Sequence, residues 1–265
     1  MFSVALRAYQ SLLVGGVGAS VARFSGALQI RYASTTSFDV AKSKRLLLSP
    51  PFACGSAPAL QKYNYVDKTA LLARIMSTEA TFLIATSMRR SGKSLVLNQL
   101  AEMARGNLAL FEGYEVTKDD SPFKFGAQKF SLIQLDFSRV LLNAAHVPFD
   151  PVLMQLRLMN FVAAEALQQH NIVLSNLPGS DLGTYLNAWV LALLLKEGNL
   201  PIVLLIDEYD APVASCFSTT LIDAPGWCAG KHADAVADIL KSFYIVTKSL
   251  DKHFHKVFVT GALLV

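Results

Sequence analysis

The stretch TFLIATSMRRSGKS, residues 81–94, decides the fold class of this chain. It opens with a short continuous apolar run, which suits a buried strand, and it ends in Gly-Lys-Ser just before a helical pattern. A strand, a loop and a helix in this order are the context of a phosphate-binding loop, whose usual sequence is G-x-x-x-x-G-K-[ST]. Ser87 stands in place of the first glycine, while Gly92, Lys93 and Ser94 match the second half of the pattern.

These residue types have definite roles in holding a phosphate. Gly92 lets the backbone come close, Lys93 neutralises the phosphate oxygens, and Ser94 offers a hydroxyl to Mg²⁺ at a helix N-terminus, which favours anions. We therefore predict Lys93 as a catalytic residue and Ser94 as a metal ligand. The residues expected to contact the nucleotide are Arg90, Ser91, Gly92, Lys93, Ser94 and Leu95.

A second pattern, IVLLIDE at residues 202–208, supplies the acidic half of such a site and matches a Walker B strand. Because ligands bind outside the carboxyl ends of parallel strands, we expect Asp207 to face the magnesium shell of Ser94. Glu208 is then the group that orients and deprotonates an attacking water. The alternative is that the two acids only end a strand and begin a turn, but the Gly-Lys-Ser about 115 residues earlier argues against it.

A third pattern, KVFVTG at residues 256–261, is a strand-like run that ends in a small polar residue. In P-loop ATPases with an extra strand between the two motif strands, this position holds a sensor that contacts the γ-phosphate or the water. Thr260 is therefore a further catalytic candidate, and we expect the run at residues 130–137 to be the extra strand. Ordinary turn chemistry at a Thr-Gly pair is the open alternative.

Apolar runs alternate with helical patterns along the body of the chain, which indicates βαβ units. The sequence predicts an α/β fold, a P-loop NTPase three-layer sandwich with a mostly parallel sheet, over residues 61–265. Strands are predicted at 81–85, 130–137, 201–206 and 256–260, and helices at 68–76, 95–105, 152–169, 181–196 and 233–253. With 52% apolar residues the chain can bury a sizeable core, which excludes a disordered protein.

The N-terminal segment has the composition of a mitochondrial transit peptide. Residues 1–38 are rich in Arg, Ser, Ala and Leu, contain no acid, and carry three of the four net positive charges. We expect cleavage near Tyr32 and a location in the mitochondrial matrix; a secreted or cytoplasmic protein is the alternative. Residues 39–60 are predicted to be a linker. The remaining charge of +1 gives no basic footprint for nucleic acid, and no apolar run reaches the length of a membrane span.

Five motifs occur in order along the body: YVDKT at 65–69, RRSGKS at 89–94, LFEG at 110–113, LIDEYDAP at 205–212 and VFVTG at 257–261. Together they resemble the AAA-ATPase-like family, whose members are P-loop ATPases often joined to a C-terminal nuclease domain of the PD-(D/E)XK type. The resemblance implies ATP and Mg²⁺ as ligands, with the roles stated above for Lys93, Ser94, Asp207 and Glu208.

The sequence departs from the family pattern in two ways. The family's loop usually reads Arg-Pro-Arg-Arg-Phe-Gly-Lys-Ser, whereas here Met88 replaces the proline and Ser91 the phenylalanine. The family's further strand, helical lid and nuclease are missing, so we expect a truncated member. Hydrolysis in such ATPases commonly needs an arginine from a lid or a neighbour. Arg89 and Arg90 in the loop are candidates to substitute in part, and a purely electrostatic or solvated role is the alternative.

The predicted function is therefore that of an ATP-binding, Mg²⁺-dependent ATPase or switch. The alternatives are a nucleotide-binding scaffold without turnover, a fragment of a larger ATPase-nuclease protein, and a small-molecule kinase, for which no acceptor site is evident. The expected partners are ATP and a protein partner or a second copy of the chain, with nucleic acid implied by the resemblance alone. Asp67 either caps the helix at 68–76 or belongs to a segment that packs on the nucleotide base.

Overall fold

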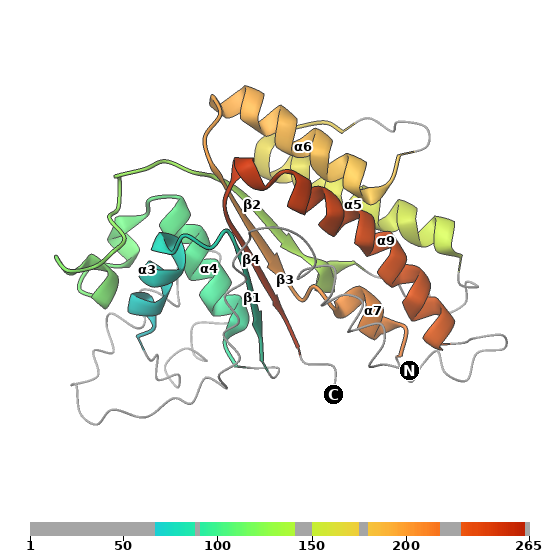
Figure 1. Cartoon of the computed structure of the whole chain (residues 1–265), viewed down its shortest axis with the longest axis horizontal. Coiled ribbons are helices and arrows are strands. Elements are labelled where there is room, and N and C mark those ends of the chain that lie inside the picture. The colour runs from blue at the N-terminus through green and yellow to red at the C-terminus, as the bar shows by residue number, and fades with distance from the viewer. Residues whose placement is uncertain (1–66, 88–90, 141–149, 175–179, 218–228, 263–265) are drawn as a thin grey trace.

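The computed structural model describes residues 67–87, 91–140, 150–174, 180–217 and 229–262. The predicted leader, the linker and the loop residues 88–90 lie outside these ranges. In the described part, parallel strands form one sheet in the order β1-β4-β3-β2 (Figure 1). Their bounds are β1 Phe82–Thr86, β2 Ser131–Asp136, β3 Ile202–Asp207 and β4 Phe254–Gly261. The predicted α/β class with a parallel sheet is confirmed.

The sheet order corrects one expectation. β4, and not the strand at residues 130–137, lies between β1 and β3, and β2 lies outside β3. β3 is the most apolar run and is buried along its length from Ile202 to Ile206, as a strand with neighbours on both edges and helices on both faces must be. The strand that carries Thr260 therefore separates the two motif strands.

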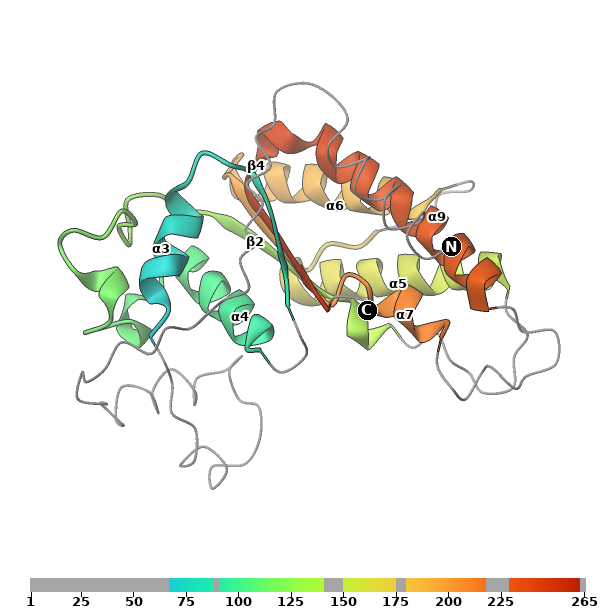
Figure 2. The ribbon, with the colours of Figure 1, turned by 60° about the horizontal axis from the view of Figure 1, so that its bottom comes forward.

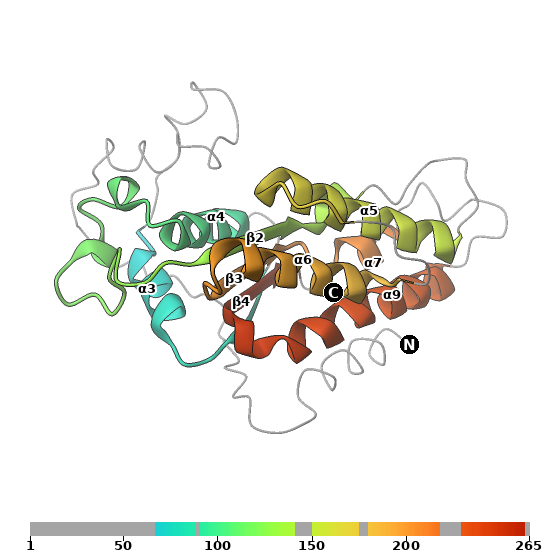
Figure 3. The same cartoon turned by 90° about the horizontal axis from the view of Figure 1, so that it is seen from above.

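Helices cover both faces of the sheet. On one face α3 (Thr69–Ser77) and α4 (Lys93–Ala104) pack over one apolar core; on the other, α5 (Pro151–His170), α6 (Leu182–Glu197), α7 (Ala211–Ser215) and α9 (Ala229–Ser249) enclose a second (Figures 1 and 2). Seen from above, α6 and α9 lie side by side (Figure 3). Short 3₁₀ turns complete the chain at Leu108–Leu110, Glu115–Thr117, Phe137–Arg139 and Asp251–His253.

Local signals set the ends of the long helices. Asp150 and Asp181 begin α5 and α6, and their side chains accept the backbone N–H groups of Val152 and Thr184. Asn171 and Gly198 end these helices in the left-handed conformation. Asp181, the first residue of the helix predicted at 181–196, therefore caps α6. Among the described residues, no helix has both the length and the apolar character that a membrane crossing needs.

The C-terminal helix differs from its prediction. α9 begins four residues before 233 and ends at Ser249, and a separate 3₁₀ turn precedes β4. His255, which lies between the predicted helix and the predicted strand, is part of β4, where its ring lies 4.6 Å from that of Phe130 and contacts the carbonyl oxygen of Met76. The helical periodicity continued past the point at which the chain must turn to enter the sheet beside β3.

Candidate functional site

The carboxyl ends of the described strands meet at one edge of the sheet, because the strands are parallel. At this edge Thr86 of β1 is paired in register with Gly261 of β4, and Asp136 of β2 with Asp207 of β3. The loop between β1 and α4 leaves the sheet here, so Lys93, the first residue of α4, and Asp207 lie at the same end of the sheet.

Lys93 folds back over the loop that precedes it. Its Nζ donates a hydrogen bond to the carbonyl oxygen of Ser87 at 3.0 Å, and the hydroxyls of Ser87 and Ser91 share a hydrogen bond of 2.5 Å. The backbone N–H of Ser87 donates to the carbonyl oxygen of Gly261 at 3.3 Å. These contacts tie the two ends of the loop to each other and to the end of β4.

Gly92 makes the turn from this loop into α4. Its φ of +87° lies in the left-handed region, which residues with a Cβ rarely adopt. Its carbonyl oxygen accepts the N–H of Val96, and no described side chain caps the helix at this end. The N–H groups of the first turn therefore face the position where an anion is favoured by the helix dipole.

The remaining loop candidates differ in their surroundings. Ser94 is exposed on the first turn of α4, whereas Leu95 is half-buried and packs against the core shared by α3 and α4. Leu95 therefore offers a ligand its backbone N–H and not its side chain. Arg90 lies outside the described residues.

Asp207 is held by two donors that use one of its oxygens. The hydroxyl of Thr260 donates to Oδ1 at 2.5 Å, and the backbone N–H of Glu208 donates to the same atom at 3.0 Å. Both hydrogen bonds are made to Oδ1, so among the described residues no hydrogen bond to Oδ2 of Asp207 is seen. The structure thus joins the second and third sequence motifs directly, through side chains 53 positions apart.

Glu208 has an unusual backbone. Its φ of +49° lies in the left-handed region, which costs a residue with a Cβ about 1–2 kcal/mol. The flanking hydrogen bonds impose this conformation: the N–H of Tyr209 donates to the carbonyl oxygen of Thr260, and the N–H of Ala211 to that of Glu208. Strain of this kind persists only where the surroundings over-determine it, and it concentrates at functional sites.

Tyr209 and Asp210 clamp the end of β4, a contact that sequence reasoning did not find. The buried carboxylate of Asp210 accepts the N–H of Ala262 at 3.3 Å, and a Cβ on Gly261 would lie 2.4 Å from the ring of Tyr209. Only glycine fits beside this ring. Burial, and to a smaller extent Asp210, raises the pKa of Tyr209 to about 12, so its phenol stays neutral.

Asp67 shows its capping role in this structure. Its Oδ1 accepts the N–H of Thr69 at 2.8 Å at the start of α3, and its Oδ2 accepts the N–H of Glu115. Of the two interpretations, the helix cap is the one that these contacts support.

The donor set at the sheet edge suits magnesium. Mg²⁺ in phosphate sites is held by one or two carboxylates, substrate oxygens and water, and Ser94 and Asp207 offer oxygen donors of this kind. In the described part of the chain, no group of three or more His, Cys, Asp or Glu residues is arranged to hold a metal by itself.

Comparison with known proteins identifies the family. Residues 59–265 match the model of a family described as predicted AAA-ATPase. The chain belongs to this family. The match covers the whole described α/β body of this AAA-ATPase-like protein, from α3 to β4. No curated protein and no solved structure gives a significant match.

The membership supports a general ATPase-like function for this chain. In this AAA-ATPase-like protein the predicted residues lie at the start of α4 or at the carboxyl ends of β3 and β4: Lys93, Ser94, Asp207, Glu208 and Thr260. Asp136 lies at the same edge, at the end of β2, and sequence reasoning missed it. The signal was an acid at the end of the second strand-like run, the same signal that singled out Asp207.

Proposed function

We propose that this chain binds ATP with Mg²⁺ at the carboxyl edge of its sheet and hydrolyses it. The observation that carries the proposal is a continuous line of contacts between the two sequence motifs. Lys93 contacts Ser87, Ser87 is bonded to Gly261 at the end of β4, and the adjacent Thr260 is bonded to Asp207. This line supports one site built from segments that are far apart in sequence.

Binding begins at the loop and the start of α4. The N–H groups of the first turn and the ammonium of Lys93 hold the β- and γ-phosphate oxygens, and Lys93 gives up the carbonyl oxygen of Ser87 for them. Exchanging a neutral carbonyl for a charged phosphate oxygen favours the bound state.

The hydroxyl of Ser94 and Oδ2 of Asp207 would hold Mg²⁺ together with the phosphates. When bound, the ion neutralises charge that develops on the phosphate oxygens. Thr260 keeps Oδ1 of Asp207 occupied and so leaves Oδ2 for the ion.

Glu208 acts on the attacking water. Its carboxylate accepts the proton as the water oxygen bonds to the γ-phosphorus and the bond between that phosphorus and the β–γ bridging oxygen breaks, which yields ADP and phosphate. The imposed left-handed backbone sets the direction in which this carboxylate leaves β3.

The test compares two variants of the full chain. Lys93→Ala removes the phosphate charge partner and should abolish ATP binding, while Glu208→Gln should keep binding and lose turnover by about 100-fold or more. Lys118→Ala is the matched control, because Lys118 pairs with Glu115 on an exposed 3₁₀ turn. If Lys93→Ala keeps its affinity for ATP, the proposed site is refuted. If the wild-type chain binds ATP tightly but shows no hydrolysis that Glu208→Gln abolishes, the protein is a non-hydrolysing scaffold instead.

We further propose a mitochondrial location, on the composition of residues 1–38. A fusion of this segment to a fluorescent protein tests it, with Arg7, Arg23 and Arg31 changed to glutamate in the control. Import that survives the three changes would contradict the proposal. A protein partner, a second copy of the chain and nucleic acid remain proposals that copurification and the mass of the particle in solution can test.

A further inference from the structure

Asp136 lies beside the proposed metal position. It ends β2 and is the direct register partner of Asp207 on β3, and neighbouring strands of a sheet are about 4.8 Å apart. Partners in register point to the same face of a sheet. The two carboxylates therefore leave the edge of the sheet side by side.

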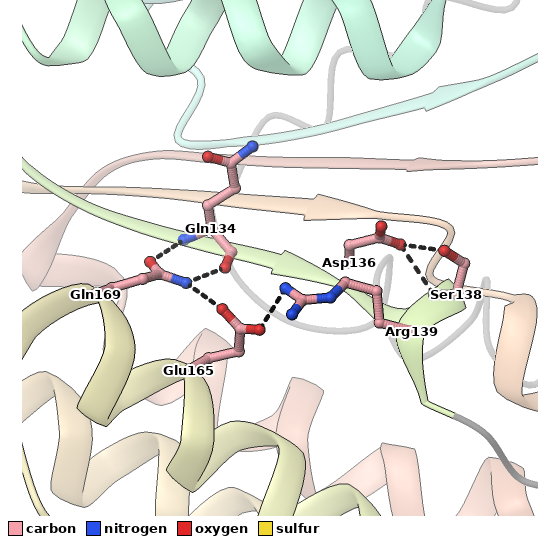
Figure 4. Close-up of polar contacts among 6 residues, drawn as sticks. All are labelled: Gln134, Asp136, Ser138, Arg139, Glu165 and Gln169. Carbon is pink, nitrogen blue, oxygen red and sulfur yellow. Dashed lines mark hydrogen bonds and ion pairs between the residues drawn. The ribbon is translucent and has the colours of Figure 1, made fainter. Parts of the chain in front are cut away.

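That face is the one covered by the phosphate-loop helix. Two residues before Asp136, the side chain of Gln134 donates to Oδ1 of Asn98 on α4 at 2.9 Å. Two residues before Asp207, Leu205 belongs to the core beneath α3 and α4. Figure 4 shows Gln134 and Asp136 directed to the same side of β2, away from Glu165. Asp136 thus faces the side of the sheet that α4 covers, and Ser94 lies in the first turn of α4.

The carboxylate of Asp136 is oriented by its own turn. Its Oδ1 accepts both the N–H and the hydroxyl of Ser138, at 3.0 and 2.6 Å (Figure 4). As at Asp207, the described residues donate hydrogen bonds to one carboxylate oxygen, and Oδ2 is the oxygen that could accept a further hydrogen bond. The group is half-buried, so a bond to it is screened less than one at an open surface.

The strand behind Asp136 is held in place. The side-chain amide of Gln169 on α5 bonds both the N–H and the carbonyl oxygen of Gln134, and the buried Glu165 ties Gln169 to Arg139 just after β2 (Figure 4). A group on such a fixed strand end is placed accurately enough to act on a bound ion.

We propose that Asp136 accepts a hydrogen bond from a water bound to the Mg²⁺ of the nucleotide. The inference rests on the proposed function. Mg²⁺ keeps several of its waters when it binds phosphates, and partners of such ligands change metal affinity by about 10–100-fold when removed. Asp136 is then a positioning residue for the metal and not a direct ligand.

The competing interpretation is that Asp136 only caps the 3₁₀ turn after β2. Asparagine and serine cap as well as aspartate, so Asp136→Asn and Asp136→Ser remove the charge and keep an oxygen for the cap. Ser138→Ala is the matched control, since it removes the hydroxyl that supports the turn and keeps the carboxylate, which the N–H of residue 138 still orients.

The experiment measures ATP binding to the full chain in EDTA and across a Mg²⁺ series. Mg²⁺ should increase the affinity for ATP, and the Mg²⁺ concentration at the midpoint of this increase should be about 10-fold higher in both Asp136 variants than in the wild type. The affinity for ATP in EDTA should stay equal or become tighter, because a carboxylate repels the metal-free triphosphate. Ser138→Ala should respond to Mg²⁺ as the wild type does. If Asp136 were only a structural cap, the Asp136 variants would not lose Mg²⁺ response while keeping their affinity for ATP in EDTA, and Ser138→Ala would behave as they do.

A wild-type response to Mg²⁺ in both variants, beside a wild-type protein that binds MgATP, overturns this inference and leaves the proposed function standing. Failure of the wild-type chain to bind ATP, or binding that ignores Mg²⁺, overturns both.

Discussion

At the scale of single residues, Thr260 acts on Asp207 in this structure. Its hydroxyl donates to Oδ1 of Asp207 at 2.5 Å, although the sequence pattern pointed to a contact with the γ-phosphate or the water. A hydrogen bond to a charged group is worth about 1.5–3 kcal/mol, and it fixes which carboxylate oxygen remains for a ligand. We therefore expect Thr260 to contribute by orienting Asp207.

Thr260→Val keeps the shape of this buried side chain and removes the donor. The loss of orientation at Asp207 should lower kcat about 10-fold and raise the Mg²⁺ needed for activity, while Thr260→Ser should restore both. Steady-state ATPase rates across a Mg²⁺ series give the measurement, with thermal melts to show that the fold is intact. A valine variant with the wild-type rate would exclude this role.

The strained backbone of Glu208 makes a prediction about stability. Glycine adopts a φ of +49° without a steric cost, whereas alanine keeps the cost that glutamate has. The free energy of unfolding, measured by denaturant titration, should therefore be about 1 kcal/mol higher for Glu208→Gly than for Glu208→Ala. At ordinary positions glycine is the less stabilising of the two residues. Equal stabilities, or a more stable alanine variant, would show that the position is unstrained.

At the scale of elements, the outer edge of β2 is closed by a side chain. An edge strand presents N–H and C=O groups that can pair with another chain. Gln169 occupies those of Gln134, with its Oε1 accepting at 3.0 Å and its Nε2 donating at 2.6 Å. The amide of one glutamine thus takes the place of a neighbouring strand (Figure 4).

Gln169→Ala should expose this edge. We expect a loss of about 1–3 kcal/mol in the free energy of unfolding and a greater tendency to aggregate, because both backbone groups of Gln134 lose their partner. Gln168→Ala is the control on the same helix, since Gln168 is exposed. Urea denaturation and light scattering measure the two effects, and a Gln169→Ala protein as stable as its control would contradict the assignment.

Most elements could be predicted because their signals are local. The apolar runs became β1 to β4, and the helix predicted at 181–196 is α6, which Asp181 caps. The end of α9 was missed because residues 250–253 keep an apolar and polar pattern while the chain turns. The clamp of Tyr209 on Gly261 was missed because neither residue shows its partner in the sequence.

At the scale of the whole molecule, the helical layer over one face of the sheet depends on a close approach. A Cβ on Gly183 of α6 would lie 2.6 Å from the carbonyl oxygen of Ser242 on α9, and the hydroxyl of Ser242 accepts the N–H of Gly183. These two helices form the side of the sandwich opposite α4 (Figures 1 and 3).

Gly183→Ala should force α6 and α9 apart and destabilise the protein by about 1–3 kcal/mol. Gly230→Ala is the control within α9, because a Cβ there meets nothing within 4 Å and alanine is the better helix former, which should raise stability by up to about 1 kcal/mol. Thermal melts of both variants give opposite shifts if the packing is as described, and shifts of the same sign contradict it.

The sequence by itself determined the types and approximate bounds of the strands and helices, the glycine at the turn into α4 and the acid at the end of β3. These follow from periodicity and residue chemistry within a few positions of each other. Only the tertiary structure decided that β4 lies between β1 and β3, that Thr260 reaches Asp207, and that Asp136 stands beside it. Strand order and register depend on pairings between residues that are far apart in the chain. These pairings are set by how the helices pack over both faces of the sheet and not by any one segment.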